Sequence, residues 1–249
     1  MAGHAIQHAV ARAKIAPAEI EDVVLGCGGP EGATGHNVAR QAALWAGCPV
    51  TTSGTTVNRF CSSGLQAIAQ ASHYIMNEGA TAAVGGGVES ISLVQMGGHM
   101  NRHHLTEEKL MREKPELWMA MIETADIVAK RYNVARDYQD EYSLRSQPRI
   151  AAAQAGGLFN DEIVPMATKM KVVNKETKEE SLVEYTVTKD ECNRADTTLA
   201  GLAKLEPVRG PGNFVTAGNA SQLSDGASAC VLMSDKEAAR QNVKPMGIV

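Results

Sequence analysis

Apolar residues recur along this chain at the spacing of helices, and short apolar runs separate them. Residues 3–15 carry Ile6, Val10 and Ala13 at positions that share one helical face, which predicts an amphipathic helix. Residues 22–26 contain the apolar run Val23-Val24-Leu25 and are typical of a buried strand. Strands that alternate with helices predict a mostly parallel sheet covered by helices.

A second apolar stripe predicts a core-facing helix over residues 65–76, ended by Gly79. Its members share one face: Leu65, Ile68, Ala69, Ser72, Ile75 and Met76. Asn37 is expected to cap a helix that runs to Trp45, and Ser234 or Asp235 to cap the last helix. Further strands are expected at 80–84, 214–217 and 229–233, with another beginning at 244–249.

The middle of the chain is more polar and predicts a separate, inserted α/β domain over residues 94–213. Two helices are expected there, at 118–132 and 137–155, and Pro148 should kink or break the second. Residues 169–173 and 182–188 predict a hairpin around a charged turn. The core domain would then comprise residues 1–93 and 214–249.

One cysteine stands where an extended run meets a helix. Thr55, Thr56 and Val57 lead to Cys61, and two serines and Gly64 open the helix that follows. A thiol at the positive end of a helix ionises more readily than a free one, and the thiolate is the form that attacks carbonyls. The alternative interpretation is a small buried apolar residue, which is the common role of a free cysteine.

The sequence motif around Cys61 resembles that of the thiolase family. The run Asn-Arg-Phe-Cys-Ser-Ser-Gly-Leu-Gln at 58–66 and the run Gly-Gly-Val-Glu-Ser-Ile-Ser at 86–92 are similar to the degradative 3-ketoacyl-CoA thiolases. The run Thr-Ala-Gly-Asn-Ala-Ser-Gln-Leu-Ser-Asp at 216–225 matches a second family motif. The resemblance implies an α/β fold: a thiolase-like, helix-flanked mixed sheet that carries a loop domain for CoA binding and oligomerisation.

The resemblance also implies a chemistry in which Cys61 attacks the 3-keto carbon of a 3-ketoacyl-CoA and CoA later collects the acyl group. It implies that Ser221 binds the pantetheine part of CoA, that Arg194 lies near its nucleotide and that Met121 lies beside the acyl pocket. Simpler readings are a turn serine, a solvated charge and an ordinary core methionine. Ile122 stands where the family commonly has glycine, which puts the local shape of that pocket in question.

Several family motifs are absent from these 249 residues. The chain has no Gly-His-Pro or Asn-Glu-Ala-Phe motif, and its last histidine is His104. Cys27-Gly28-Gly29 looks like the family's Cys-x-Gly motif but lies upstream of Cys61, so we expect it to be a loop. The sequence is thus expected to be part of a thiolase, without the first strand and the C-terminal domain, and to be inactive alone.

Composition excludes several other classes of protein. A net charge of −4 gives no general attraction to nucleic acid, and CoA as a substrate is the only cofactor-like molecule expected. Five irregularly spaced cysteines argue against a disulfide framework or a zinc site and favour a reducing compartment, the cytoplasm.

No signal peptide, membrane span, nucleotide loop at 85–87 or metal site among the histidines at 99–104 is expected. The intact enzyme should be a homodimer or a homotetramer.

Three rival functions remain open at this level. An acetoacetyl-CoA thiolase shares the fold and differs in chain-length preference. A condensing enzyme of the ketoacyl-synthase type also uses a cysteine elbow, although the sequence motifs at 58–64 and 216–221 disfavour this class. A non-catalytic thiolase-like protein that binds acyl-CoA or lipid is disfavoured by the intact Cys61.

Overall fold

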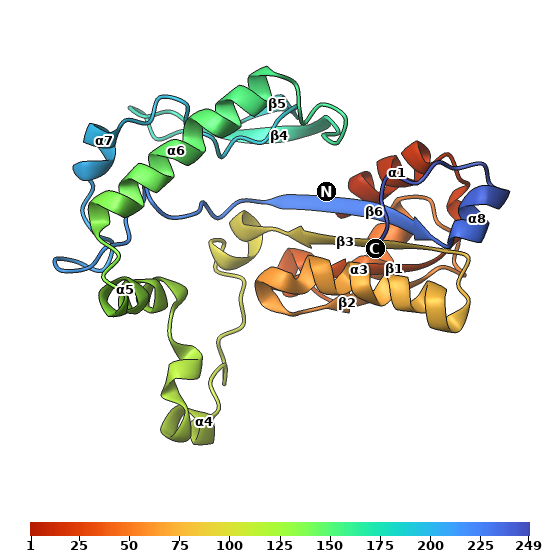
Figure 1. Cartoon of the computed structure of the whole chain (residues 1–249), viewed down its shortest axis with the longest axis horizontal. Coiled ribbons are helices and arrows are strands. Elements are labelled where there is room, and N and C mark those ends of the chain that lie inside the picture. Colours follow the sequence, from red (N-terminus) through yellow and green to blue (C-terminus); the bar gives the residue numbers. More distant parts are fainter. The chain divides into compact units, whose positions relative to one another are not determined.

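The structure is a computed structural model that describes residues 1–249, and the chain divides into two compact units. The first unit comprises Met1–Asn101 and Ser224–Val249, and the second comprises Arg102–Leu223 (Figure 1). Relative to the insertion expected at 94–213, residues 94–101 lie in the first unit and residues 214–223 lie in the second.

A four-stranded mixed sheet forms the centre of the first unit (Figure 1). Its strands are β1 (Ile20–Gly26), β2 (Ser53–Val57), β3 (Ala82–Glu89) and β6 (Gly226–Met233), in the order β2-β1-β3-β6. β1 runs parallel to β2 and β3, whereas β6 runs antiparallel to β3. The expected helix-flanked mixed sheet is therefore confirmed.

Helices cover both faces of this sheet. Val23 and Leu25 of β1 pack with α1 (Ala2–Ala13) and α2 (Val38–Trp45) in one apolar cluster. Val24 between them packs with α3 (Ser63–His73) in a second cluster. Successive side chains of a strand point to opposite faces, so a continuous apolar run supplies both clusters.

The predicted helix ends are confirmed by their capping contacts. Asn37 Oδ1 accepts the amide of Arg40 at 3.2 Å and begins α2. Ser234 Oγ accepts the amide of Glu237 at 3.1 Å and begins α8 (Asp235–Arg240). Gly79, with φ of 79°, ends the π-helical turn Tyr74–Glu78 that follows α3.

The predicted core-facing stripe over residues 65–76 is confirmed only in part, since Ile68 and Ile75 pack against the apolar cluster under the helix. Leu65 and Met76 are 71% and 74% exposed, whereas Ser63, Ala67 and Ala71 form the buried face. The reason is the closeness of the sheet: a Cβ on Gly85 of β3 would lie 2.9 Å from the Cα of Ile68. The fully buried face of the helix therefore consists of small side chains, and Ile68 packs where Gly85 leaves room for it.

Two predicted strands are also absent. Residues 214–217 form a loop in the second unit, because the amides of Phe214 and Val215 bond to a carboxylate instead of a neighbouring strand. Residues 244–249 form no strand and are exposed. The strand predicted at 80–84 begins at Ala82 and is longer than predicted, because it continues through the three glycines at 85–87 to Glu89.

The second unit contains four helices and a hairpin. They are α4 (Glu108–Glu113), α5 (Met121–Arg131), α6 (Arg136–Ala155), β4 (Met166–Val173), β5 (Glu180–Val187) and α7 (Leu199–Ala203). The expected hairpin is confirmed as the antiparallel β4–β5 pair. The expected break at Pro148 is absent: α6 continues through this exposed proline, which costs the helix one backbone hydrogen bond. None of the helices is both long enough and apolar enough to cross a bilayer.

Candidate active site

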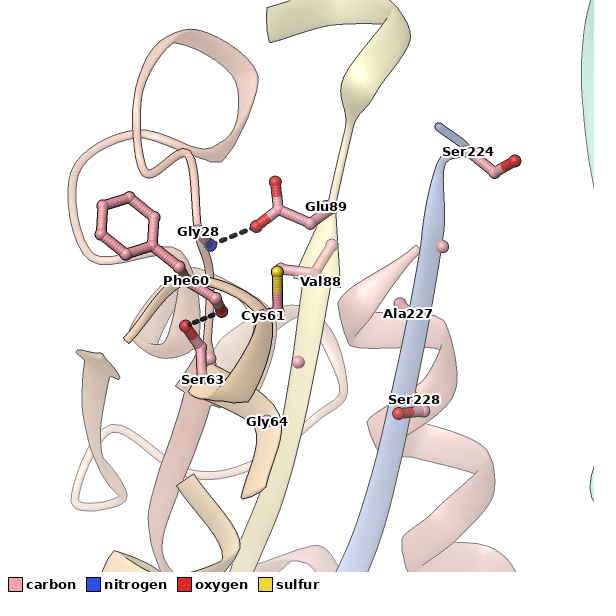
Figure 2. Close-up of a pocket in the computed structure, with 13 residues that line it drawn as sticks. Gly28, Phe60, Cys61, Ser63, Gly64, Val88, Glu89, Ser224, Ala227 and Ser228 are labelled. Atoms are coloured by element: carbon pink, nitrogen blue, oxygen red, sulfur yellow. Dashed lines mark hydrogen bonds between the residues drawn. The ribbon is translucent and has the colours of Figure 1, made fainter. Parts of the chain in front are cut away.

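A cavity of about 400 Å³ lies in the first unit where β1 and β3 end and β6 begins (Figure 2). Its lining includes Cys61, Gly28, Glu89 and Ser224. Cys61 is exposed, and Figure 2 shows its side chain lining the cavity together with Val88 and Glu89. Ligands of open α/β sheets bind outside the carboxyl ends of the parallel strands, which is where this cavity lies.

The predicted strand-to-helix elbow at Cys61 is confirmed. β2 ends at Val57, a 3-10 turn covers Phe60–Ser62, and α3 follows directly. The amides on both sides of Cys61 are satisfied: Phe60 N bonds Asn58 Oδ1 at 2.9 Å and Ser62 N bonds the Arg59 carbonyl at 3.2 Å. The Cys61 amide forms no such bond, so it is an available donor at the positive end of α3.

The elbow holds an uncommon backbone conformation immediately before the thiol. Phe60 has φ of 47°, a conformation that costs about 1–3 kcal/mol for a bulky residue and persists only where its surroundings enforce it. Ser63, buried below the turn, provides such support. Its hydroxyl accepts the Arg59 amide at 2.8 Å and donates to the Phe60 carbonyl at 2.6 Å.

Other cysteines of this unit differ from Cys61 in their surroundings. Burial raises the pKa of the Cys27 thiol, and the nearby Glu89 carboxylate adds to that rise. Burial also raises the pKa of the Cys48 and Cys230 thiols. All three are therefore kept protonated at neutral pH, and none of them lines the cavity. Cys27 follows β1 in a loop, as the sequence predicted.

Glu89 is a cavity residue that the sequence reasoning missed. It is the last residue of β3, and its Oε1 accepts the amides of Gly28 and, at 3.2 Å, Gly29 (Figure 2). An acidic residue at the carboxyl end of a buried strand was the available signal, since that position lies at the carboxyl edge of the sheet.

The other predicted site residues belong to the second unit, and two of them lie on connected segments. Ser221 and Arg194 are exposed, and Gln222 Nε2 next to Ser221 donates to the Cys192 carbonyl at 3.1 Å. Gln147 Oε1 accepts the Arg194 amide at 2.8 Å and so fixes that segment on α6. Met121, 72% exposed at the start of α5, takes part in none of these contacts.

Comparison with known proteins decides the family. The sequence profile described as "Thiolase, N-terminal domain" matches residues 1–236, nearly the whole chain. The chain belongs to the thiolase family. The suspected resemblance to thiolases is therefore confirmed.

This thiolase chain is similar to relatives with several names. It is 41% identical over 227 residues to a 3-ketoacyl-CoA thiolase of Bacillus subtilis, covering 91% of this chain and 57% of the relative. It is 40% identical over 241 residues to a beta-ketoadipyl-CoA thiolase of Pseudomonas putida (91% and 58%). It is 37% identical over 244 residues to an acetyl-CoA acetyltransferase of Shinella zoogloeoides (95% and 59%). The thiolase chain thus spans less than two thirds of these relatives.

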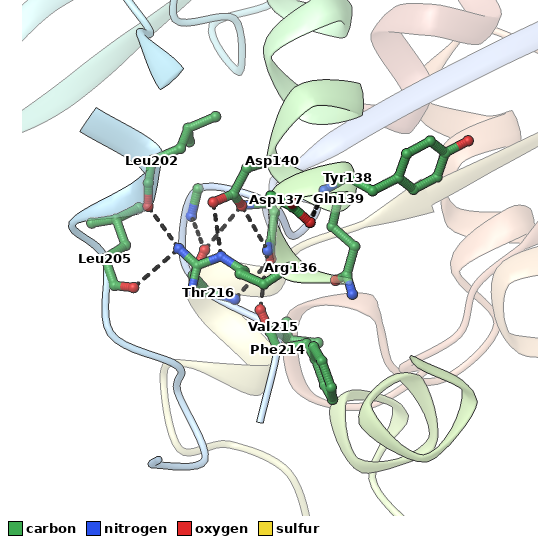
Figure 3. A network of polar contacts seen from close by, with 12 residues as sticks. Arg136, Asp137, Tyr138, Gln139, Asp140, Leu202, Leu205, Phe214, Val215 and Thr216 are labelled. Carbon is green, nitrogen blue, oxygen red and sulfur yellow. Dashed lines mark hydrogen bonds and ion pairs between the residues drawn. The ribbon is translucent and has the colours of Figure 1, made fainter. Parts of the chain in front are cut away.

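Two buried aspartates, Asp126 and Asp140, hold the loop of the thiolase chain that leads to Ser221, and Figure 3 shows Asp140 beside Arg136. Asp140 of α6 accepts Arg136 Nε at 2.8 Å and Asn219 Nδ2 at 3.1 Å. Asp126 of α5 accepts the amides of Phe214 at 2.8 Å and Val215 at 3.2 Å. The Asp126 carboxylate therefore accepts the two amides that a neighbouring strand would bind, and Asp140 holds the side chain of Asn219.

Replacing Asp126 with asparagine is expected to weaken this thiolase unit at neutral pH and much less in acid. Burial raises the pKa of Asp126, but the amides of Phe214 and Val215 and the Arg209 guanidinium outweigh it, so its pKa lies below the ordinary 3.8. A depressed folded-state pKa gives stability that is present above 3.8 and is lost as pH falls through the folded-state value. We expect a loss of about 1–3 kcal/mol at pH 7.

Urea unfolding of the Asp126→Asn variant and the unsubstituted chain, each at several pH values from neutral to strongly acidic, measures this dependence. The Asp137→Asn variant, which changes an exposed aspartate at the start of α6, is the control. A difference in unfolding free energy between Asp126→Asn and the unsubstituted chain that stays constant over the whole pH range would contradict the role given to the ionised carboxylate.

Proposed function

We propose that this chain supplies the nucleophile of a 3-ketoacyl-CoA thiolase, an acyltransferase that cleaves a 3-ketoacyl-CoA with CoA. The observation that carries the proposal is Cys61, an exposed thiol at the start of α3 that lines a cavity at the carboxyl edge of the sheet. Two further observations support it: the run at 58–66 is similar to that of degradative thiolases, and a 3-ketoacyl-CoA thiolase is among the relatives. The proposal places the enzyme in fatty acid β-oxidation and in the cytoplasm.

The thiolate of Cys61 attacks the 3-keto carbon and forms a tetrahedral adduct whose oxygen carries the negative charge. The carbon–carbon bond then breaks, acetyl-CoA leaves as an enolate that is protonated, and the acyl group stays on the sulfur as a thioester. The thiol of a second CoA attacks this thioester and restores Cys61. The available amide of Cys61 is the donor that we assign to a developing oxyanion, and loss of one such donor costs about 2.7–4 kcal/mol.

For the second unit we propose CoA contacts. Ser221 binds the pantetheine arm, Arg194 the nucleotide phosphates and Met121 the acyl group. The exposure of all three and the Gln222–Cys192 hydrogen bond between the first two segments support this assignment. A guanidinium suits phosphate because it offers several donors in a fixed plane. CoA acts as substrate, no metal or other cofactor is required, and the enzyme acts as a homodimer or homotetramer.

An acetoacetyl-CoA thiolase is the second candidate function, favoured by the acetyl-CoA acetyltransferase among the relatives. Thiolysis of acetoacetyl-CoA and of longer 3-ketoacyl-CoA substrates by the full-length gene product separates the two. The proposal predicts turnover of the longer substrates, whereas turnover of acetoacetyl-CoA alone identifies the second candidate. Absence of turnover on every substrate would leave only a non-catalytic binder of acyl-CoA or lipid.

The isolated 249-residue chain is expected to show negligible thiolysis. No histidine lines the cavity of Cys61, and a positioned general base contributes typically about 10²–10⁴-fold. Cleavage of acetoacetyl-CoA by the pure chain, compared with the Cys61→Ala variant of the same chain, measures this. Cleavage that depends on Cys61 and approaches the rate of an intact thiolase would contradict the expectation.

A further inference from the structure

The end of β3 is connected to the turn before Cys61 through one peptide group. Glu89 Oε1 accepts the amide of Gly29 at 3.2 Å, and it accepts the amide of Gly28 as well. The carbonyl of Gly28, which is the other end of the Gly28–Gly29 peptide, accepts Asn58 Nδ2 at 3.2 Å. Hydrogen bonds at both ends of one peptide polarise it and strengthen each other.

Asn58 continues this connection to the thiol. Its Oδ1 accepts the amide of Phe60 at 2.9 Å, and Phe60 directly precedes Cys61. The positive φ of Phe60 is a conformation that persists only where neighbouring groups enforce it. Glu89, the Gly28–Gly29 peptide and Asn58 therefore form a continuous path to the backbone that presents the thiol.

The loop that carries Gly28 packs closely against both Glu89 and the turn before Cys61. A Cβ on Gly28 would lie 3.2 Å from Glu89 Oε1 and 3.7 Å from the Cα of Phe60. The carboxylate, the loop and the turn thus pack directly against one another. A carboxylate suits the position because bonds from amides to a charged acceptor are about twice as strong as neutral ones.

We propose that Glu89 is a positioning residue for Cys61, which acts through the Gly28–Gly29 peptide and Asn58 to aim the Cys61 amide and sulfur into the cavity. This inference rests on the proposed nucleophilic role of Cys61. It adds to that role a residue that makes no bond to the thiol itself and whose removal should disturb acyl transfer more than access to the sulfur.

Two reactions of the same sulfur distinguish positioning from access. Acetylation by p-nitrophenyl acetate passes through an oxyanion: Cys61 Sγ bonds to the carbonyl carbon and p-nitrophenolate leaves with the electron pair. Alkylation by iodoacetamide displaces iodide and forms no oxyanion. The ratio of the two rates at Cys61, read by peptide mass spectrometry, therefore reports on the alignment of sulfur and amide. Exposed Cys192 in the same chain is the internal reference.

Glu89→Ala is expected to lower the acetylation-to-alkylation ratio at Cys61 about tenfold and to leave that of Cys192 unchanged. Glu89→Gln should restore most of the ratio, because its carbonyl oxygen still accepts the two amides. The matched control is Glu21→Ala, which removes a carboxylate that accepts the Thr81 amide at 2.8 Å just before β3 begins. This control should leave the ratio at Cys61 unchanged.

Asn58→Asp tests the same path if Glu89→Ala does not fold. The aspartate still accepts the Phe60 amide but turns an oxygen toward the Gly28 carbonyl, so a similar fall in the ratio is expected. An unchanged ratio in Glu89→Ala or in Asn58→Asp overturns the inference, as does an equal fall in Glu21→Ala. Failure of the proposed function looks different: the unsubstituted chain then shows no higher ratio at Cys61 than at Cys192, which also contradicts a positioned thiol.

Discussion

Replacing Cys61 with serine is expected to lower kcat for thiolysis by the full-length gene product by at least about 10³-fold. A serine hydroxyl is nearly the same size but stays protonated at neutral pH, and it is a much weaker nucleophile than a cysteine thiolate. The first covalent step therefore fails, whereas binding of CoA through the second unit should persist. Steady-state kinetics with a 3-ketoacyl-CoA, together with CoA binding by calorimetry, separate the two effects.

Cys230→Ser is the matched control for this prediction. Cys230 lies in β6, where its Sγ donates to the Gly85 carbonyl at 3.4 Å, and a serine hydroxyl can donate to the same acceptor. Its kcat should stay within a factor of about two of the unsubstituted enzyme, since it is not among the cavity residues. A Cys61→Ser variant with a similarly preserved kcat would rule out the acyl-enzyme on this sulfur.

Replacing Gly26 with alanine is expected to destabilise the first unit by about 3 kcal/mol or more. A Cβ at this position would lie 2.3 Å from the carbonyl carbon of Ser63 and 2.5 Å from the nitrogen of Gly64. Both are backbone atoms at the start of α3, so no side chain can rotate away, and the helix must move off the sheet. The free energy of unfolding from urea titration measures the loss, and the elbow at Cys61 should be disturbed with it.

Gly64→Ala is the control from the same contact. A Cβ on Gly64 would meet nothing within 4 Å, and this helical glycine has no positive φ. Alanine should therefore stabilise the unit by about 0.4–1 kcal/mol, because it restricts the unfolded chain. Equal effects of the two substitutions would show that the strand and the helix do not approach each other as closely as the structure places them.

Local sequence patterns predicted the elements around the site well. Asn37 and Ser234 have side chains suited to cap helices, and both caps form. The elbow at Cys61 follows from a β-branched run that meets two serines and a glycine, and it is confirmed. Each of these features depends on residues within about four positions of one another, which is the range over which capping and turn chemistry act.

Features that depend on distant segments escaped prediction. The buried face of α3 is set by glycines in β1 and β3, so Ala67 and Ala71 face the sheet while Leu65 is exposed. Residues 214–217 have the composition of a strand, yet the amides of Phe214 and Val215 donate to buried Asp126, which lies on a different element, α5. Hydropathy along the chain carries no information about such partners.

The candidate site shows the same division. Cys61 was identified from its own neighbours, whereas Glu89 bonds to residues about sixty positions away and was recognised only as part of the run at 86–92, without a role in the site. The segments of Ser221 and Arg194 meet through Gln222 and the Cys192 carbonyl, a contact that no local spacing encodes. The roles of Ser221, Arg194 and Met121 toward CoA stay predictions.

Trapping with an acyl-CoA analogue tests the central claim most directly. The full-length gene product is incubated with a haloacetyl-CoA, which delivers an electrophilic carbon on a CoA carrier, and the modified peptide is identified by mass spectrometry. We predict a single adduct on Cys61 that forms faster than with iodoacetamide and is slowed by excess CoA. An adduct on another cysteine, or labelling of Cys61 that CoA does not slow, would contradict a thiolase nucleophile in this cavity.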